Sequence, residues 1–206
     1  MAKVTSTLPY AMFKESLLRY ARRAYSEKRA DSSALDVAMI SPTPLDLIRT
    51  VVSDLSLYLK ASSDFVFICD LGCGDGRWLF ALMDSNEFDY NCVCYGVEIS
   101  DERITKTVLN QLHRNIDVDD NVTSHRVKLL EVVKADFFQH MRFDDIDVVI
   151  AYLSIEGNRL LKDKIEHECR KGTLVVSVGF KIHGLPVQKM WESKERTLFF
   201  AYLYIL

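Results

Sequence analysis

Residues 65–82 read FVFICDLGCGDGRWLFAL, an apolar run followed by glycines and then by a helical pattern. Residues 65–69 carry aromatic, β-branched or small side chains and no charge, which is typical of a buried strand. Three glycines alternate after Asp70, at Gly72, Gly74 and Gly76. From Arg77 on, the apolar side chains return at helical spacing. The stretch therefore predicts a strand, a tight turn and a helix.

The glycine turn favours the binding of a ligand. Glycine permits positive φ, and because it has no Cβ it lets a ligand approach the backbone. The first amides of the following helix lack intrahelical partners, so we expect a donor-rich pocket. In the dinucleotide pattern G-x-G-x-x-G the third glycine follows the second by three positions, whereas Gly76 follows Gly74 by two. The spacing favours a ligand other than a pyrophosphate, with a purely structural turn as the alternative.

The rest of the chain alternates strand-like and helical segments. Further strands are expected at residues 92–97, 127–133, 148–153, 173–180 and 196–206. Helices are expected at residues 8–29, 45–60, 100–112 and 158–170. This order predicts an α/β fold with a doubly wound, mostly parallel sheet, an antiparallel closing strand and helices on both faces. A short strand near residues 187–190 would complete seven strands; without it the sheet is trimmed.

Two details of the helices follow from the pattern. Thr43 precedes Pro44 and is expected to cap the helix over residues 45–60. The helix over residues 100–112 should face inward through its regularly spaced apolar residues, which are Ile104, Val108, Leu109 and Leu112.

Acidic residues stand at the ends of two predicted strands. Glu98 follows the strand over residues 92–97, where α/β folds use a carboxylate to accept hydrogen bonds from two ribose hydroxyls. Its alternative role is that of an acid at a helix N-terminus. Asp136 follows the strand over residues 127–133. Because parallel strands end at one edge of the sheet, we expect the glycine turn, Glu98 and Asp136 to lie together.

The arrangement D-x-G-x-G-x-G from Asp70 to Gly76 resembles motif I of the seven-strand (class I) S-adenosylmethionine-dependent methyltransferases. The resemblance spans residues 42–206 and implies a Rossmann-like sheet that binds S-adenosyl-L-methionine and releases S-adenosyl-L-homocysteine. Lys134 to Phe138 is similar to the family's adenine-binding element. Carried over by position, the cofactor contacts implied are Thr43, Asp70, Gly72, Cys73, Gly74, Gly76, Glu98, Ile99, Asp136, Phe137 and Tyr152.

Within this family the layout is most similar to the small protein-lysine methyltransferases of the ATP synthase c subunit type. The similar features are a helix and a Pro-Thr loop before motif I, the turn DLGCGDGR, and a sparse end after the fifth strand. Tyr152 and Ser154 are implied to line the substrate channel. Residues 151–154 read AYLS, which departs from the Asn/Asp-Pro-Pro-Tyr of many amino-group methyltransferases and argues against methylation of nucleic-acid bases. A small-molecule or RNA methyltransferase and a non-catalytic cofactor-binding partner subunit stay open as alternatives.

Composition sets the remaining bounds. With 206 residues we expect one domain, with an N-terminal helix and connection over residues 1–41 and a cofactor-binding core over residues 42–206. The net charge of −3 gives no general attraction to nucleic acid, so the expected partner is a protein substrate, with the oligomeric state left open.

The cysteines and the N-terminus bear on the cellular setting. The five cysteines include no C-x-x-C pair, so we expect no metal site and a reducing compartment. No apolar run reaches the ~20 residues that a membrane span needs. We expect an intracellular, cytoplasmic protein, and the basic N-terminal segment leaves a mitochondrial presequence open.

Overall fold

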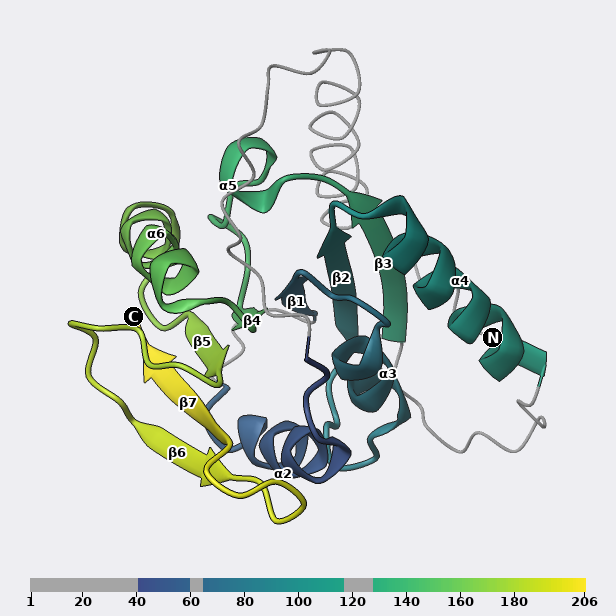
Figure 1. Cartoon of the computed structure of the whole chain (residues 1–206), viewed down its shortest axis with the longest axis horizontal. Helices are drawn as coiled ribbons and strands as arrows, with labels where there is room; N and C mark the ends of the chain where they lie inside the picture. The colour runs from purple at the N-terminus through teal and green to yellow at the C-terminus, as the bar shows by residue number, and fades with distance from the viewer. Residues whose placement is uncertain (1–40, 60–64, 117–127) are drawn as a thin grey trace, which may run out of the picture.

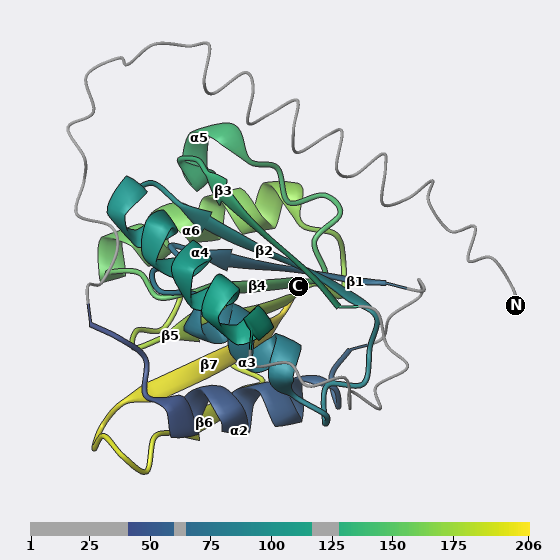
Figure 2. The same cartoon turned by 90° about the vertical axis from the view of Figure 1, so that its right-hand side faces the viewer.

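The computed structural model describes residues 41–59, 65–116 and 128–206, which form one sheet with helices on its two sides (Figures 1 and 2). The helix expected over residues 8–29 and most of the N-terminal connection lie outside the described residues. No helix within the described ranges is both long and apolar enough to cross a bilayer.

The sheet has seven strands in the order β3-β2-β1-β4-β5-β7-β6. The strands are β1 (Val66–Leu71), β2 (Cys92–Glu98), β3 (Lys128–Lys134), β4 (Val148–Ala151), β5 (Leu174–Val178), β6 (Lys189–Glu192) and β7 (Phe200–Ile205). The first five are parallel, and β7 is antiparallel to both β5 and β6. The prediction of a mostly parallel sheet with an antiparallel closing strand is confirmed, and β6 completes the seven strands.

Helices cover both faces of the sheet, as predicted. The helices are α2 (Leu45–Leu55), α3 (Arg77–Asp84), α4 (Asp101–Ile116), α5 (Phe137–His140) and α6 (Ile155–Glu168). Side chains alternate along each strand, so Val66 and Ile68 pack with α2 and α3 while Cys69 and Leu71 pack with α5 and α6. Both layers bury apolar side chains, which is why the central strands read as continuous apolar runs.

Two local predictions are wrong. Pro44, and not Thr43, occupies the N-cap position of α2, and among the described residues no side chain caps that helix. The buried side of α4 is also different, because Val108 is 40% and Leu109 50% exposed while Thr107 is fully buried. The Thr107 hydroxyl donates to the carbonyl oxygen of Gly74 at 2.7 Å, so a hydrogen bond to the glycine turn sets the orientation of the helix. Apolar spacing alone could not reveal this bond.

The strand ends converge at one edge of the sheet. Leu71 at the end of β1 pairs with Val97 of β2 and with Ala151 of β4. Because the five parallel strands point the same way, the residues that follow them gather at this edge. Val178 at the end of β5 pairs with Ala201 of β7, so the beginning of β7 lies at the same edge.

Candidate functional site

The glycine turn after β1 is held by bonds within the protein. Four of its backbone amides donate hydrogen bonds to other protein atoms. The amides of Gly72 and Cys73 donate to the carbonyl oxygen of Val97 at 2.8 and 3.1 Å. The Gly74 amide donates to Oε2 of Glu98 at 3.2 Å, and the Gly76 amide donates to the carbonyl oxygen of Cys73 at 2.9 Å. The amides of the turn itself therefore offer few donors to a ligand. A ligand here meets glycine backbone and carboxylates, which suits a positively charged group better than a pyrophosphate.

The turn needs glycine for two different reasons. Gly72, Gly74 and Gly76 have φ values of 73°, 58° and 78°, as the predicted tight turn requires. A Cβ on Gly72 would meet no atom within 4 Å, so this residue faces open space. A Cβ on Gly76 would lie 2.6 Å from Cγ2 of Thr107 and 2.8 Å from a ring carbon of Phe80. The first part of the turn is therefore open to a ligand, and the last part is a packing contact between α3 and α4.

Asp70 is a buried carboxylate at the end of β1. It is 3% exposed, and within the described residues its Oδ2 has no hydrogen-bond partner. Burial, together with the nearby charges of Glu98 and Asp75, raises the pKa of Asp70 to about 8. A cationic donor that entered beside Gly72 would satisfy this oxygen and favour its ionised form.

Glu98 joins the end of β2 to the glycine turn. It is 2% exposed; its Oε1 accepts from the amides of Ile99 at 2.9 Å and Ser100 at 3.0 Å, and its Oε2 accepts from the Gly74 amide. Arg103 lies 3.8 Å away from the same oxygen. The structure thus brings Glu98 and the turn into contact, while the two amides just before α4 also give it the helix-terminus role.

The segment after β3 lies beside Glu98. The amide of Ala135 donates to the carbonyl oxygen of Glu98 at 3.1 Å. The next residue, Asp136, is half-buried and caps α5 by accepting from the amide of Phe138 at 2.9 Å. Phe137 is buried, whereas Ile99 is 62% exposed at the end of β2. The three strand ends that the sequence predicts to meet are therefore neighbours.

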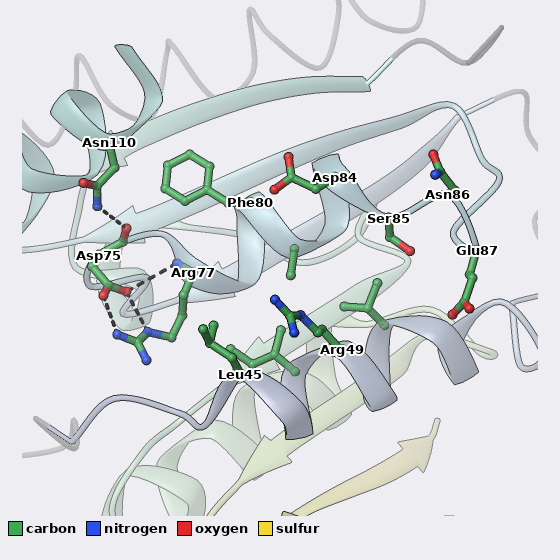
Figure 3. Close-up of a pocket in the computed structure, with 13 residues that line it drawn as sticks. Leu45, Arg49, Asp75, Arg77, Phe80, Asp84, Ser85, Asn86, Glu87 and Asn110 are labelled. Atoms are coloured by element: carbon green, nitrogen blue, oxygen red, sulfur yellow. Dashed lines mark hydrogen bonds and ion pairs between the residues drawn. The ribbon is translucent and has the colours of Figure 1, made fainter. Parts of the chain in front are cut away.

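Arg77 is a residue of the site that the sequence interpretation missed. Its guanidinium donates to the carbonyl oxygen of Thr43 at 2.8 Å and pairs with Asp75 (Figure 3). The Trp78 indole donates to the Thr43 hydroxyl at 3.4 Å, so Thr43 is buried against the start of α3. The carbonyl oxygen of Asp75 accepts from the Asn110 side chain at 3.2 Å. The sequence feature that could have indicated Arg77 is its position directly after Asp75 and Gly76 of motif I.

Tyr152 follows β4 at the same edge of the sheet and is held on two sides. Its ring meets the Phe199 ring edge-on, with centroids 5.6 Å apart and an interplanar angle of 85°. On another side a Cβ on Gly179 would lie 2.7 Å from a Tyr152 ring carbon. Burial raises the pKa of Tyr152, although Arg196 and a hydrogen bond with Ser41 act in the opposite direction. The phenol therefore stays protonated at neutral pH.

Ser154 begins α6. Its hydroxyl oxygen accepts from the Gly157 amide at 3.1 Å, which is the bond of an N-cap residue. This bond explains why α6 starts at Ile155, earlier than the predicted residue 158. One lone pair of the hydroxyl oxygen is used by the cap, and a second acceptor position is left.

A separate groove lies between α2, α3 and α4 (Figure 3). It has a volume of about 840 Å³ and an apolar floor that includes Ile48, Val52 and Phe80. It shares Asp75 and Arg77 with the glycine turn but extends along α3 toward Asp84, at the opposite end of that helix. The strand-end site and this groove are therefore different places, and the acidic residues at the strand ends define the candidate site.

Comparisons with known proteins agree with the geometry. The family described as "ANTKMT methyltransferase domain" matches residues 70–189. A protein-lysine N-methyltransferase of Saccharolobus islandicus (strain REY15A) is 34% identical over 155 residues, which cover 75% of this chain and 80% of that protein.

Solved structures show the same fold at low sequence identity. An RNA methyltransferase from Salinibacter ruber in complex with S-adenosyl-L-homocysteine has a TM-score of 0.61 at 21% identity, over 80% of this chain and 93% of that one. The rRNA methyltransferase AviRa from Streptomyces viridochromogenes has a TM-score of 0.56 at 9% identity, over 85% and 88%. At these identities the likeness concerns the fold alone.

The residues at the strand ends fit the cofactor of such enzymes. The Oδ2 of Asp70 has no hydrogen-bond partner among the described residues and can accept from a cationic group, the backbone at Gly72 is open, and Glu98 lies beside the turn. The family match and the relative name a methyltransferase, and the fold is the one found in solved methyltransferases. The chain therefore belongs to the ANTKMT methyltransferase family and is an S-adenosylmethionine-dependent methyltransferase of the class I fold.

Proposed function

We propose that this protein transfers the methyl group of S-adenosylmethionine to the ε-amino group of a lysine in a protein substrate. The family match and the relative named as a protein-lysine N-methyltransferase support this acceptor. The observation that carries the cofactor side is the buried Asp70 carboxylate, whose Oδ2 has no hydrogen-bond partner in the part of the chain that the structure describes, two residues before the open backbone of Gly72.

Different residues at the strand ends would bind different parts of the cofactor. Asp70 would hold the ammonium group of the amino-acid part, with the turn formed by Gly72, Cys73, Gly74 and Gly76 beside it. Glu98 would accept from the ribose hydroxyls and Asp136 from the amino group of adenine, with Ile99 and Phe137 as neighbours of the base. Thr43 and Tyr152 are assigned to the part of the cofactor that carries the methyl group. When bound, the cofactor supplies a methyl group activated by a sulfonium, so the protein contributes alignment and the removal of water.

The acceptor amine must be neutral before it attacks the methyl group. Tyr152 is half-buried against Phe199, and an apolar channel lowers the pKa of a lysine that enters it. The protonated Tyr152 phenol and the Ser154 hydroxyl offer oxygen acceptors for the amine hydrogens. They orient the nitrogen lone pair toward the methyl group for an in-line displacement.

Methyl transfer into a lysate tests the proposal. The protein is incubated with tritiated S-adenosylmethionine and a cell lysate, and portions are then treated with protease or with nuclease. We expect label that protease releases and nuclease leaves in place. Label released by nuclease supports RNA instead, and label that passes a small-pore filter before any digestion supports a small molecule.

The same assay covers the non-catalytic alternative. A chain that binds S-adenosylhomocysteine in calorimetry but transfers no label would be a cofactor-binding subunit without its own activity. That result would contradict the enzymatic proposal and leave the assignment of the cofactor residues intact.

A further inference from the structure

The loop between β6 and β7, residues 193–199, lies at the edge of the sheet that carries the cofactor motifs. Val178 at the end of β5 pairs with Ala201, and the Gly179 amide donates to the carbonyl oxygen of Phe200 at 2.8 Å. These bonds join the beginning of β7 to the end of β5. The loop that precedes β7 therefore lies near the end of the neighbouring strand β4, which Tyr152 follows. Figure 2 shows the same loop next to the beginning of α2.

The loop supplies one side of the surroundings of Tyr152. Phe199 is buried and meets the Tyr152 ring edge-on at 5.6 Å, while Gly179 borders the ring elsewhere. The Arg196 guanidinium lies over the Phe199 ring at 4.5 Å and donates to the Ser41 hydroxyl at 2.9 Å. The loop therefore supplies one of the two contacts that hold the Tyr152 ring.

The carboxylate of Asp46, in the first turn of α2, holds this loop. It accepts from the Ser193 hydroxyl at 2.9 Å, from the Glu195 amide at 3.3 Å and, at shorter range, from the Lys194 amide. The Ser193 hydroxyl oxygen in turn accepts from the Arg196 amide at 3.0 Å. The Ser193 amide closes the loop by donating to the carbonyl oxygen of Phe199 at 2.9 Å. A chain of hydrogen bonds thus runs from Asp46 to both ends of the loop.

The loop needs this support because one of its residues is held in an unfavourable conformation. Leu198 has a φ of 57°, in the left-handed region, and its side chain is 77% exposed. For a residue with a Cβ this conformation is unfavourable, because the Cβ comes close to the following carbonyl oxygen. Such strain persists only where neighbouring contacts fix the backbone, and it is concentrated at functional sites. Here the bonds of Asp46 and Ser193 hold the backbone on both sides of Leu198, at residues 193–196 and at the carbonyl oxygen of Phe199.

We propose that Asp46 is a positioning residue for the methyl acceptor. By holding residues 193–199 it fixes the buried Phe199 ring behind Tyr152, and the half-buried Tyr152 ring is the wall along which the methylene chain of a lysine packs as its amine approaches the cofactor. The inference rests on the proposed function, because it assigns a role on the acceptor side of the same site. Asp46 itself touches neither the acceptor nor the cofactor.

Asp54 offers a matched control. It lies on the same helix and is half-buried like Asp46. Its carboxylate accepts from the indole of Trp191 at 2.7 Å, and Trp191 lies on β6, the first strand of the β6–β7 hairpin. Asp54 lies at the far end of α2, away from the strand-end site. Asp46→Ala and Asp54→Ala each remove one carboxylate anchor of the hairpin, but only the first releases the loop.

The test compares steady-state methyl transfer to the nuclease-treated protein fraction of a lysate as the concentration of S-adenosylmethionine is varied. We expect Asp46→Ala to lower kcat about tenfold, with the cofactor KM and the affinity for S-adenosylhomocysteine unchanged, because a small misplacement of the acceptor is costly. Asp54→Ala should keep the kcat of the unmodified chain. Trypsin should cut after Lys194 or Arg196 faster in Asp46→Ala only.

Ser193→Ala provides a second route to the same answer should Asp46→Ala fold poorly. It should lower kcat in the same direction, and the double variant should lose less than the product of the two single losses, since both residues act through one loop. Equal kcat values for Asp46→Ala and Asp54→Ala, or for Ser193→Ala and the unmodified chain, overturn the positioning role. No transfer by the unmodified chain instead overturns the proposed function, and the positioning role with it.

Discussion

At the scale of single residues, Asp70 illustrates how function opposes stability. Burial raises the pKa of Asp70 to about 8, so the folded protein holds a proton that the unfolded chain releases near pH 4. Between these values the unfolded state binds fewer protons, and stability falls as the pH rises toward 8. A residue that costs stability at neutral pH is typical of a binding site.

We therefore predict that Asp70→Asn stabilises the protein and weakens the binding of the cofactor. Asparagine does not titrate, so near pH 8 the melting temperature should rise by on the order of 10 °C, whereas at pH 4 the two proteins should melt alike. The affinity for S-adenosylmethionine should fall about tenfold, because a charge-assisted bond is lost. Calorimetric melting and titration measure both effects.

Asp75→Asn is the matched control for this prediction. Asp75 is bonded to Arg77, which lowers the pKa of its carboxyl. Its substitution should lower the melting temperature at neutral pH. A decrease for Asp70→Asn as well, or undiminished cofactor affinity, would contradict the role given to Asp70.

Two glycines of the turn should respond differently to alanine. Gly72→Ala introduces a Cβ into open space at positive φ, so we expect a loss of about 1 kcal/mol in the free energy of unfolding and a marked loss of cofactor affinity. Gly76→Ala adds overlap with Thr107 and Phe80, and about 3 kcal/mol should be lost. Urea unfolding with titration of S-adenosylhomocysteine separates the two. Similar losses of stability would show that the turn is uniformly packed.

At the scale of elements, the N-cap residue of α6, Ser154, allows its capping role to be separated from its proposed role in methyl transfer. Ser154→Ala removes the bond from the Gly157 amide and should cost about 1 kcal/mol of stability. Ser154→Asn restores the cap. If the hydroxyl also accepts from the lysine amine, the asparagine variant regains stability while its kcat stays below that of the unmodified chain. Full activity of Ser154→Asn would leave Ser154 with a capping role only.

The elements also show what sequence can and cannot predict. The strand, turn and helix over residues 65–82 were predictable because neighbours in the sequence determine them, and the convergence of Glu98 and Asp136 followed from parallel topology. The hydrogen bonds that join α2 to the β6–β7 hairpin were not predictable. Asp46 bonds with Ser193 and Asp54 with Trp191, and the members of each pair are more than 130 residues apart in the sequence. A polar residue on a helix surface gives no sign of such a partner. Thr107 escaped prediction for the same reason, since its partner is a backbone oxygen.

At the scale of the whole molecule, the proposed function assigns different tasks to the two halves of the sheet. The turn after β1 and the ends of β2 and β3 gather the acidic residues assigned to the cofactor. The ends of β4 and β5 and the beginning of β7 gather Tyr152, Gly179 and Phe199 on the acceptor side. The antiparallel β7 makes this possible, because its reversed direction brings the β6–β7 loop to the edge where the parallel strands end.

The identity of the labelled amino acid tests the central claim most directly. Protein labelled by this enzyme with tritiated S-adenosylmethionine is hydrolysed in acid, and the amino acids are separated by chromatography. We predict that the label elutes with Nε-methylated lysine and that Asp70→Asn, assayed in parallel, yields none at limiting cofactor. Label in any other amino acid, or no incorporation by the unmodified protein, would contradict the account.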